Sequence, residues 1–181
     1  MDKARLELWV IEAQSGCEKS FEKLCRHYHP ALLRFSFKIC GDENIARDAV
    51  QNSWMKLTKT LRRLQDPRAF KSWVYRLVRW QTLDIVKRSS NEFIEFTSTE
   101  LNDEIYVEHE EESIDTEDKL KTLLTSLSEL DKQVIHLFYL EEMRLVEIAH
   151  VLEVPVGTIK SRLNRARNNL KAQLNNQEKR L

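Results

Sequence analysis

The chain has 181 residues and a formal net charge of zero, and charged residues make up 32% of it. Only three glycines and three prolines occur, and strand patterns are nearly absent, so the composition predicts an all-α protein and argues against β-rich classes. No apolar run could span a bilayer and no secretion signal opens the chain, which predicts a cytoplasmic protein without stable membrane insertion. Cys17, Cys25 and Cys40 are odd in number and lack a Cys-x-x-Cys spacing, which argues against a disulfide framework or a zinc ribbon and leaves their role open.

The zero net charge hides a segregation along the chain. Residues 1–88 carry 18 Lys and Arg against 10 Asp and Glu, and residues 119–181 carry 11 against 7. Residues 89–118, between them, carry 12 Asp and Glu and no Lys or Arg. We therefore expect two small basic helical domains, 1–88 and 119–181, joined by an acidic flexible linker. Basic charge on both domains favours a polyanionic partner for each of them.

Apolar periodicity predicts four helical stretches in residues 1–88. An apolar run at Leu6–Ile11 belongs to the first, and Gly16 is expected to end it. The second runs from Ser20 to Cys40, with Pro30 as a kink or a restart. The third and fourth follow the Gly41 stop, and both bear on function.

The third helix is expected from Ile45 to about Leu64, with Asp42 or Asn44 as its N-cap. One side of this helix is apolar. Three polar residues lie off that stripe and should face outward: Asp48, Gln51 and Asn52. Their spacing by itself indicates only a solvated helix face.

An aromatic and basic helix follows the turn at residues 66–68. Core packing accounts for Phe70, Trp73, Val74 and Leu77, but less well for the aromatic and cationic residues on its other faces. Aromatic rings beside cations suit unpaired bases of single-stranded nucleic acid. The candidate residues for such binding are Arg68, Lys71, Trp73, Tyr75, Arg76, Arg79, Trp80, Lys87 and Arg88.

The second domain ends in a pattern typical of a helix-turn-helix, at residues 145–170. Pro155 suits the start of its second helix, and an apolar stripe follows at Ile159, Leu163, Ala166 and Leu170. The opposite face is polar and basic, as base edges and phosphates require. Ser161, Asn164, Arg165 and Asn168 stand opposite the stripe, with Lys160 to one side. Arg162 and Arg167 flank this face and are candidates for phosphate contacts. Upstream, residues 128–131 resemble a capping box with Asp in place of Glu.

These stretches resemble a known family. Residues 127–137, 147–152 and 155–167, including the string Pro-Val-Gly-Thr-Ile-Lys-Ser-Arg, look like the −35-reading domain of bacterial sigma factors. Residues 46–57 and 70–79, with Asp84 and Lys87-Arg88, agree independently. The chain is most similar to the extracytoplasmic-function group of the sigma-70 family, which has two domains.

The resemblance implies a role for each set of residues. Asp48, Gln51 and Asn52 would dock on the clamp of the largest subunit of core RNA polymerase. The segment 66–88 would capture a flipped base of the melted −10 element, and Lys160, Ser161, Asn164 and Arg165 would read the −35 duplex. An anti-sigma factor is a possible further partner. The chain departs from the family pattern at Trp80, where Asn is frequent, and at Glu153, where Gly is frequent.

The sequence therefore predicts a promoter-specificity subunit with no catalytic activity. The alternative is a free-standing helix-turn-helix regulator that binds DNA without polymerase. An enzyme has little support, because no paired carboxylates or His/Cys ligand set is recognisable, and no metal or cofactor is expected. Cys25, His27 and His29 lie close together, but they lack a second ligand cluster and are interpreted as ordinary helix residues.

Overall fold

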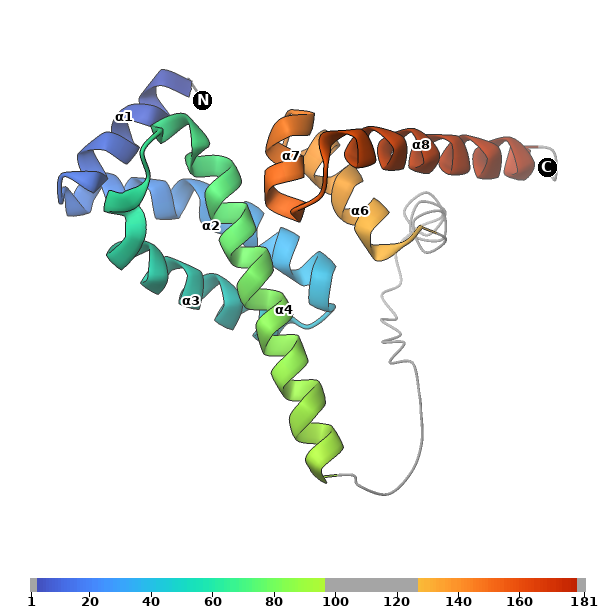
Figure 1. The fold of residues 1–181 in the computed structure, drawn as a ribbon, viewed down its shortest axis with the longest axis horizontal. Helices are drawn as coiled ribbons and strands as arrows, with labels where there is room; N and C mark the ends of the chain where they lie inside the picture. Colours follow the sequence, from blue (N-terminus) through green and yellow to red (C-terminus); the bar gives the residue numbers. More distant parts are fainter. Residues whose placement is uncertain (1–2, 97–126, 179–181) are drawn as a thin grey trace. The chain divides into compact units, whose positions relative to one another are not determined.

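The computed structural model describes residues 3–96 and 127–178, and in these two segments every regular element is helical (Figure 1). The chain divides into two compact units. The first is built on α1 (Lys3–Gln14), α2 (Glu18–Cys40), α3 (Glu43–Thr60), η1 (Leu61–Arg63), η2 (Pro67–Ala69) and α4 (Phe70–Phe96). The second is built mainly on α6 (Glu129–Ile135), η3 (His136–Leu140), α7 (Leu145–Leu152) and α8 (Val156–Glu178). The all-α prediction is confirmed.

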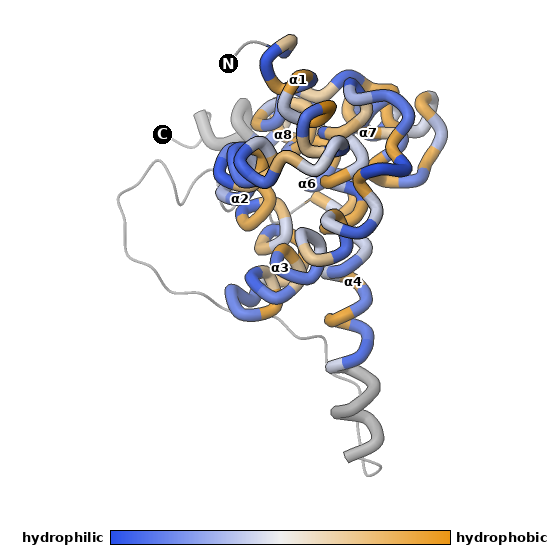
Figure 2. Tube along the Cα trace, turned by 90° about the vertical axis from the view of Figure 1, so that its left-hand side faces the viewer, coloured by the Kyte–Doolittle hydropathy of each residue, from blue (hydrophilic) through white to orange (hydrophobic). Residues whose placement is uncertain are grey.

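In the first unit, α2, α3 and α4 pack against one another, and α1 lies against α2. Hydrophobic and hydrophilic residues follow one another along these helices (Figure 2). Each helix buries apolar residues against the others. The core residues come from all three long helices: Leu24, Leu32, Phe35, Ala49, Val50, Leu57, Phe70, Val74, Tyr75 and Val78. This three-helix core fixes the positions of α3 and α4, which carry the candidate surface residues.

The helix boundaries of the first unit follow the predicted stop and start signals. Gly41 has a left-handed φ of 68°, and its N–H donates to the Phe37 carbonyl at the end of α2. Of the two predicted caps for α3, Asp42 is the one used, since its side chain accepts from the Ile45 N–H at 2.9 Å. α2 runs through Pro30 as one helix, so a restart there is wrong.

α4 continues past residue 88 to Phe96, so the first residues of the expected linker, 89–96, are helical. The acidic segment therefore begins inside a helix. No Pro or Gly interrupts residues 70–96, and Glu and Phe do not stop a helix that is already propagating. The rest of the predicted linker, residues 97–118, lies outside the described residues.

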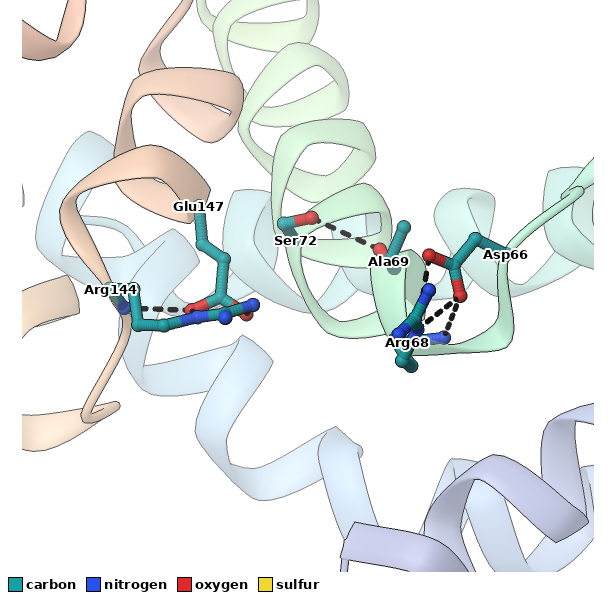
Figure 3. Close-up of polar contacts among 6 residues, drawn as sticks. All are labelled: Asp66, Arg68, Ala69, Ser72, Arg144 and Glu147. Atoms are coloured by element: carbon teal, nitrogen blue, oxygen red, sulfur yellow. Dashed lines mark hydrogen bonds and ion pairs between the residues drawn. The ribbon is translucent and has the colours of Figure 1, made fainter.

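The second unit contains the predicted helix-turn-helix, with α7 as its first helix and α8 as its second. Pro155 directly precedes α8, and its carbonyl accepts the Ile159 N–H at 3.1 Å. At the start of α7 the Glu147 carboxylate accepts the backbone N–H of Arg144 at 2.7 Å and its guanidinium at 3.2–3.3 Å (Figure 3). This contact caps α7 at its N-terminus.

The turn between α7 and α8 contains a strained residue. Glu153 has φ 58° and ψ 39°, the left-handed conformation, and its N–H donates to the Ala149 carbonyl. Glycine adopts this conformation without a steric penalty, whereas a residue with a Cβ is disfavoured by about 1–2 kcal/mol.

Glu153→Gly should therefore raise the free energy of unfolding of the second unit by about 1 kcal/mol, since the relieved strain exceeds the extra entropy of an unfolded glycine. Amide hydrogen exchange in α7 and α8 would measure the change. Glu153→Ala is the matched control, because it removes the carboxylate but keeps the Cβ. Equal stabilisation by both substitutions would contradict a backbone origin.

Candidate nucleic-acid interfaces

A cleft of about 740 Å³ lies in the first unit, between the end of α3, the segment that follows it and the start of α4. Its lining combines cationic with apolar and aromatic side chains, namely Lys56, Lys59, Arg63, Leu64, Trp73 and Leu77. Cations suit the phosphates of a nucleic-acid strand, and apolar or aromatic surfaces suit the faces of unpaired bases. We call this the main cleft.

A smaller cleft of about 210 Å³ adjoins it further along α4. The two share Lys56, Trp73 and Leu77, and the smaller cleft adds Arg76, Trp80 and Gln81. Trp80 is 59% exposed although it is the largest kind of apolar side chain. A large exposed ring at a cleft lined by cations is a surface on which a base can stack.

The segment between α3 and α4, which forms one wall of the main cleft, is held in place at both ends. From α1, the Gln14 amide donates to the Leu61 carbonyl at 3.1 Å and to the Leu64 carbonyl at 2.6 Å. At the other end the Asp66 carboxylate accepts the backbone N–H of Arg68 at 3.0 Å and its side-chain Nε at 3.0 Å (Figure 3). The Ser72 hydroxyl then donates to the Ala69 carbonyl at 3.0 Å in the first turn of α4.

These contacts also set the charge of Asp66. Hydrogen bonds from the Arg68 side chain and backbone favour the ionised carboxylate, so the pKa of Asp66 lies below its usual value. Asp66 lines the main cleft, so its pairing with Arg68 partly neutralises an acidic side chain there and fixes the turn that leads into α4.

Of the residues predicted to bind a single strand, Trp73, Arg76 and Trp80 line the two clefts. The other six lie outside these linings: Arg68, Lys71, Tyr75, Arg79, Lys87 and Arg88. Arg68, Lys87 and Arg88 are exposed, and Arg88 forms an ion pair with Asp84 at 2.8 Å. Their contact with DNA stays a prediction.

Tyr75 is a correction. We expected its ring on the nucleic-acid surface, but the side chain is fully buried. Its ring packs against Phe35 of α2, with centroids 5.3 Å apart and planes tilted by 54°. Helical spacing explains the error, since residues 74, 75 and 78 all fall on the side of α4 that faces the core.

Sequence reasoning missed the wall of the main cleft that is formed by Lys56 and Lys59 of α3 and Arg63 of η1. It also missed Gln81, which is only 5% exposed yet lines the smaller cleft. The available signal was the run of basic residues at the end of α3. That run became informative only once packing placed it beside Trp73.

On α3 itself, Asp48, Gln51 and Asn52 are exposed, as predicted. Buried residues on the opposite side of the helix, Ala46, Ala49, Val50 and Ser53, pack it against the unit. The exposed set therefore forms a polar face on a rigidly held helix, which suits a protein partner.

α8 divides into two faces as the periodicity predicted. Ile159, Leu163 and Ala166 are buried, whereas Lys160, Ser161, Asn164, Arg165 and Arg167 are exposed. The exposed residues supply donors and cations along one side of a helix that follows a short turn. Such a helix can enter a major groove, where its side chains meet base edges.

Two of the α8 arginines are held from α6. The Asp131 side chain is 3% exposed, and its carboxylate accepts from Arg162 Nη1 at 3.1 Å and from Arg165 Nη2 at 2.5 Å. Ser128 caps α6 as predicted, since its hydroxyl oxygen accepts the Asp131 N–H at 3.3 Å, but the Asp131 carboxylate is directed at α8. We call these three side chains the Asp131 clamp.

Burial by itself raises the pKa of the Asp131 carboxyl, but hydrogen bonds from Ser128, Arg165 and Arg162 together outweigh it. The pKa therefore lies below its usual value, and the carboxylate is ionised at neutral pH. Arg162 is the more enclosed of the two arginines, with 27% of its side chain exposed against 54% for Arg165. The clamp leaves Arg165 the better placed of the two to reach DNA.

Arg167 is fixed differently. Its guanidinium lies 5.2 Å from the ring centroid of Phe138 and 5.4 Å from that of Tyr139, and its Nε donates to the Tyr139 hydroxyl at 2.6 Å. Stacking on two aromatic rings of η3 holds the cation at the surface of α8. This arrangement is compatible with the predicted phosphate contact.

Comparison with protein families matches both units. Residues 24–92 match the Sigma-70 region 2 model, and residues 123–172 match the Sigma-70, region 4 model. The chain belongs to the sigma-70 family. Its relatives include the ECF RNA polymerase sigma factor SigW of Bacillus subtilis, 23% identical over 176 residues, which cover 91% of this chain and 94% of SigW. Another is the ECF RNA polymerase sigma-E factor of Haemophilus influenzae, 27% identical over 87% of this chain and 89% of that protein.

Solved structures share the fold of this sigma factor. One is CnrH in complex with the cytosolic domain of CnrY, with a TM-score of 0.67 and 22% sequence identity. The match covers 94% of this chain and 97% of CnrH. Another is the sigma factor RpoE of Bartonella quintana in complex with the anti-sigma factor NepR, with a TM-score of 0.67, 24% identity, and coverage of 87% and 98%. The sigma factor described here is a member of the extracytoplasmic-function group.

In the described parts of this sigma factor, no helix is both long and apolar enough to cross a membrane. The three cysteines are free thiols, and their role stays open.

Proposed function

We propose that this sigma factor binds core RNA polymerase and directs it to promoters through two different DNA contacts. The carrying observation is that one chain holds a cleft suited to unpaired bases and a helix suited to a duplex groove. In this proposal the chain supplies promoter specificity and core polymerase carries out the chemistry.

In this proposal the duplex is read at the −35 element by α8. Lys160, Ser161, Asn164 and Arg165 face base edges, and Arg162 and Arg167 support them from the sides. Each good base contact is worth about 1–3 kcal/mol of discrimination. The second unit, residues 119–181 by our domain assignment, carries this step.

The −10 element is bound as a single strand by the first unit, residues 1–88 and the continuation of α4. Removing a base from the duplex costs a few kcal/mol, and stacking on an aromatic side chain returns about 1–3 kcal/mol per base. The clefts therefore favour the melted state without doing chemistry. Arg68, Lys71, Arg79, Lys87 and Arg88 add attraction for the strand along α4.

Polymerase docking falls to the exposed face of α3. Asp48, Gln51 and Asn52 would contact the clamp of the largest subunit, so that both DNA surfaces act at a fixed spacing. An anti-sigma factor is a further proposed partner, since RpoE, one of the proteins that share this fold, was solved in complex with the anti-sigma factor NepR. We also propose a cytoplasmic location, because core RNA polymerase and promoter DNA are its proposed partners and CnrH was solved with a cytosolic domain.

Reconstitution tests the proposal. Core polymerase with and without the full chain would be assayed for run-off transcription on promoters found by transcript-start mapping after overexpression. We expect specific initiation only with the chain present. A chain that binds duplex DNA tightly by itself and ignores polymerase would instead support the free-standing regulator.

Trp80→Ala should weaken binding of holoenzyme to a pre-melted promoter by about 1–3 kcal/mol, the value of one stacked base. Its 59% exposure means that the thermal stability of the protein should hardly change. Filter binding and thermal melting would measure the two effects. If the variant bound melted DNA with the affinity of the wild type, Trp80 would not be a −10-binding residue.

A further inference from the structure

We propose that the smaller cleft is a second base-binding subsite, in which Trp80 stacks on an unpaired base and Gln81 reads the edge of that base. The inference rests on the proposed function and deepens it, because it assigns base specificity to one side chain. The inference starts from the burial of Gln81 and from the hydrogen bonding of its side-chain amide.

Gln81 is 5% exposed and lines a cleft that also contains two tryptophans. Its neighbour Thr82 is fully buried and is satisfied: its hydroxyl meets that of Ser36 at 2.7 Å and donates to the Val78 carbonyl. Across residues 3–96 and 127–178, by contrast, no hydrogen bond involves the Gln81 amide. The amide is not among the fully enclosed unpaired groups of these segments, so it opens onto the cleft, where water or a ligand can bond it.

The chemistry of the cleft indicates what that partner is. An amide presents one donor and one acceptor side by side, which matches the edges of nucleic-acid bases. Trp80 and Trp73 supply flat apolar surfaces, and Lys56 and Arg76 supply positive charge for the flanking phosphates. Aromatic surfaces, cations and one amide together fit a nucleotide of a single strand better than an apolar ligand or a simple anion.

The two side chains have separable roles. Stacking tolerates any base, because every base has a flat face, so Trp80 contributes affinity without sequence preference. Hydrogen bonding from Gln81 depends on the arrangement of donors and acceptors, so Gln81 contributes preference. A strand passing through both clefts would thus be read at one nucleotide by Gln81.

The test uses holoenzyme assembled from core polymerase and the full chain. A pool of single-stranded oligonucleotides with six randomised positions would be bound, recovered and sequenced for the wild type, Gln81→Leu and Gln81→Glu. In the wild type we expect a preferred base at the Gln81 position, enriched roughly tenfold. Gln81→Leu should flatten that one position and leave the others. Gln81→Glu, which replaces the amide donor by an acceptor, should change which base is preferred.

Arg26→Gln on the exposed side of α2 is the matched control, and its profile should equal that of the wild type. Thermal melting of each variant checks that the fold is intact. If Gln81→Leu does not fold, quenching of 2-aminopurine placed at the preferred position of the wild-type complex tests the stacking, and Trp80→Leu should relieve it.

Unchanged base preferences in both Gln81 variants would overturn the inference, and so would an equal loss at every position. Absence of quenching at the preferred position would overturn it as well. A wild-type holoenzyme that binds no single strand would instead remove the proposed function itself, so the two failures are distinguishable.

Discussion

Tyr75→Ala should lower the free energy of unfolding of the first unit by about 3–5 kcal/mol, the usual result of removing a large ring from a packed core. The side chain is fully buried, and its ring contacts Phe35 across the α2–α4 interface. Neighbouring core residues cannot fill a cavity of that size without moving whole helices. Chemical denaturation of the protein, followed by the tryptophan fluorescence of the first unit, would measure the loss.

Tyr75→Phe is the control that separates packing from DNA contact. It keeps the ring and its contact with Phe35, so stability should change by less than about 1.5 kcal/mol. Binding to melted DNA should be retained in Tyr75→Phe and, below its melting temperature, in Tyr75→Ala. A stable Tyr75→Ala protein with weak DNA binding would return Tyr75 to the nucleic-acid surface. Trp80→Ala should show the reverse pattern, with stability kept and DNA affinity lost.

Asp131→Asn should destabilise the second unit by about 2–3 kcal/mol and reduce its discrimination between −35 sequences. Breaking a buried ion pair usually costs about 3–5 kcal/mol, and the lower figure applies here because Arg165 can turn into water. The more enclosed Arg162 would lose its anionic partner while part of its guanidinium, the Nε, stays buried without a hydrogen bond. Hydrogen exchange in α6 and α8 would follow the stability.

The effects on DNA binding should differ between specific and non-specific sequences. Removal of a negative charge beside two arginines strengthens their attraction for any phosphate, so the salt dependence of binding should steepen by up to about one charge. Arg165 would lose its fixed position, so the base-dependent contribution proposed for it should fall. Binding titrations of holoenzyme on matched and altered −35 duplexes, at several salt concentrations, would separate the two effects.

Glu129→Gln on the same helix is the control for charge alone. Glu129 is exposed and pairs with Lys132 at 2.6 Å, so its loss should cost less than about 0.5 kcal/mol. If both substitutions changed stability and specificity equally, net charge would be the cause and the clamp would have no special role.

The clamp also predicts a pH dependence. The pKa of Asp131 lies below its usual value in the folded protein, so folding favours the ionised carboxylate. The stabilisation is present above the unfolded pKa of about 3.9 and is lost as the pH falls further, through the folded pKa. As the pH falls below about 4, the free energy of unfolding of the wild type should therefore decrease faster than that of Asp131→Asn. Chemical denaturation at several pH values would measure both, and parallel pH profiles of the two proteins would contradict the clamp.

The faces of single helices could be predicted from the sequence. Periodicity alone placed Ile159, Leu163 and Ala166 inside and Lys160, Ser161 and Asn164 outside, and it placed Asp48, Gln51 and Asn52 outward on α3. The N-caps could also be predicted from the sequence, because Asp42 and Ser128 bond within the first turn of their own helices. Such features depend on residues three or four positions apart, which the sequence displays directly.

Contacts between helices that are far apart in the chain could not be predicted from the sequence. The clefts needed Lys56 and Lys59 of α3 beside Trp73 of α4, and the burial of Tyr75 needed α2 on one side of α4. The Asp131 clamp joins residues 31 and 34 positions apart, and its Asp looked in the sequence like half of a capping box.

Sequence by itself determined that the chain is helical, basic at both ends and carries a helix-turn-helix. The tertiary structure alone decided which aromatic and cationic side chains reach the surface together, because burial depends on the partner helix as well as on the residue's own.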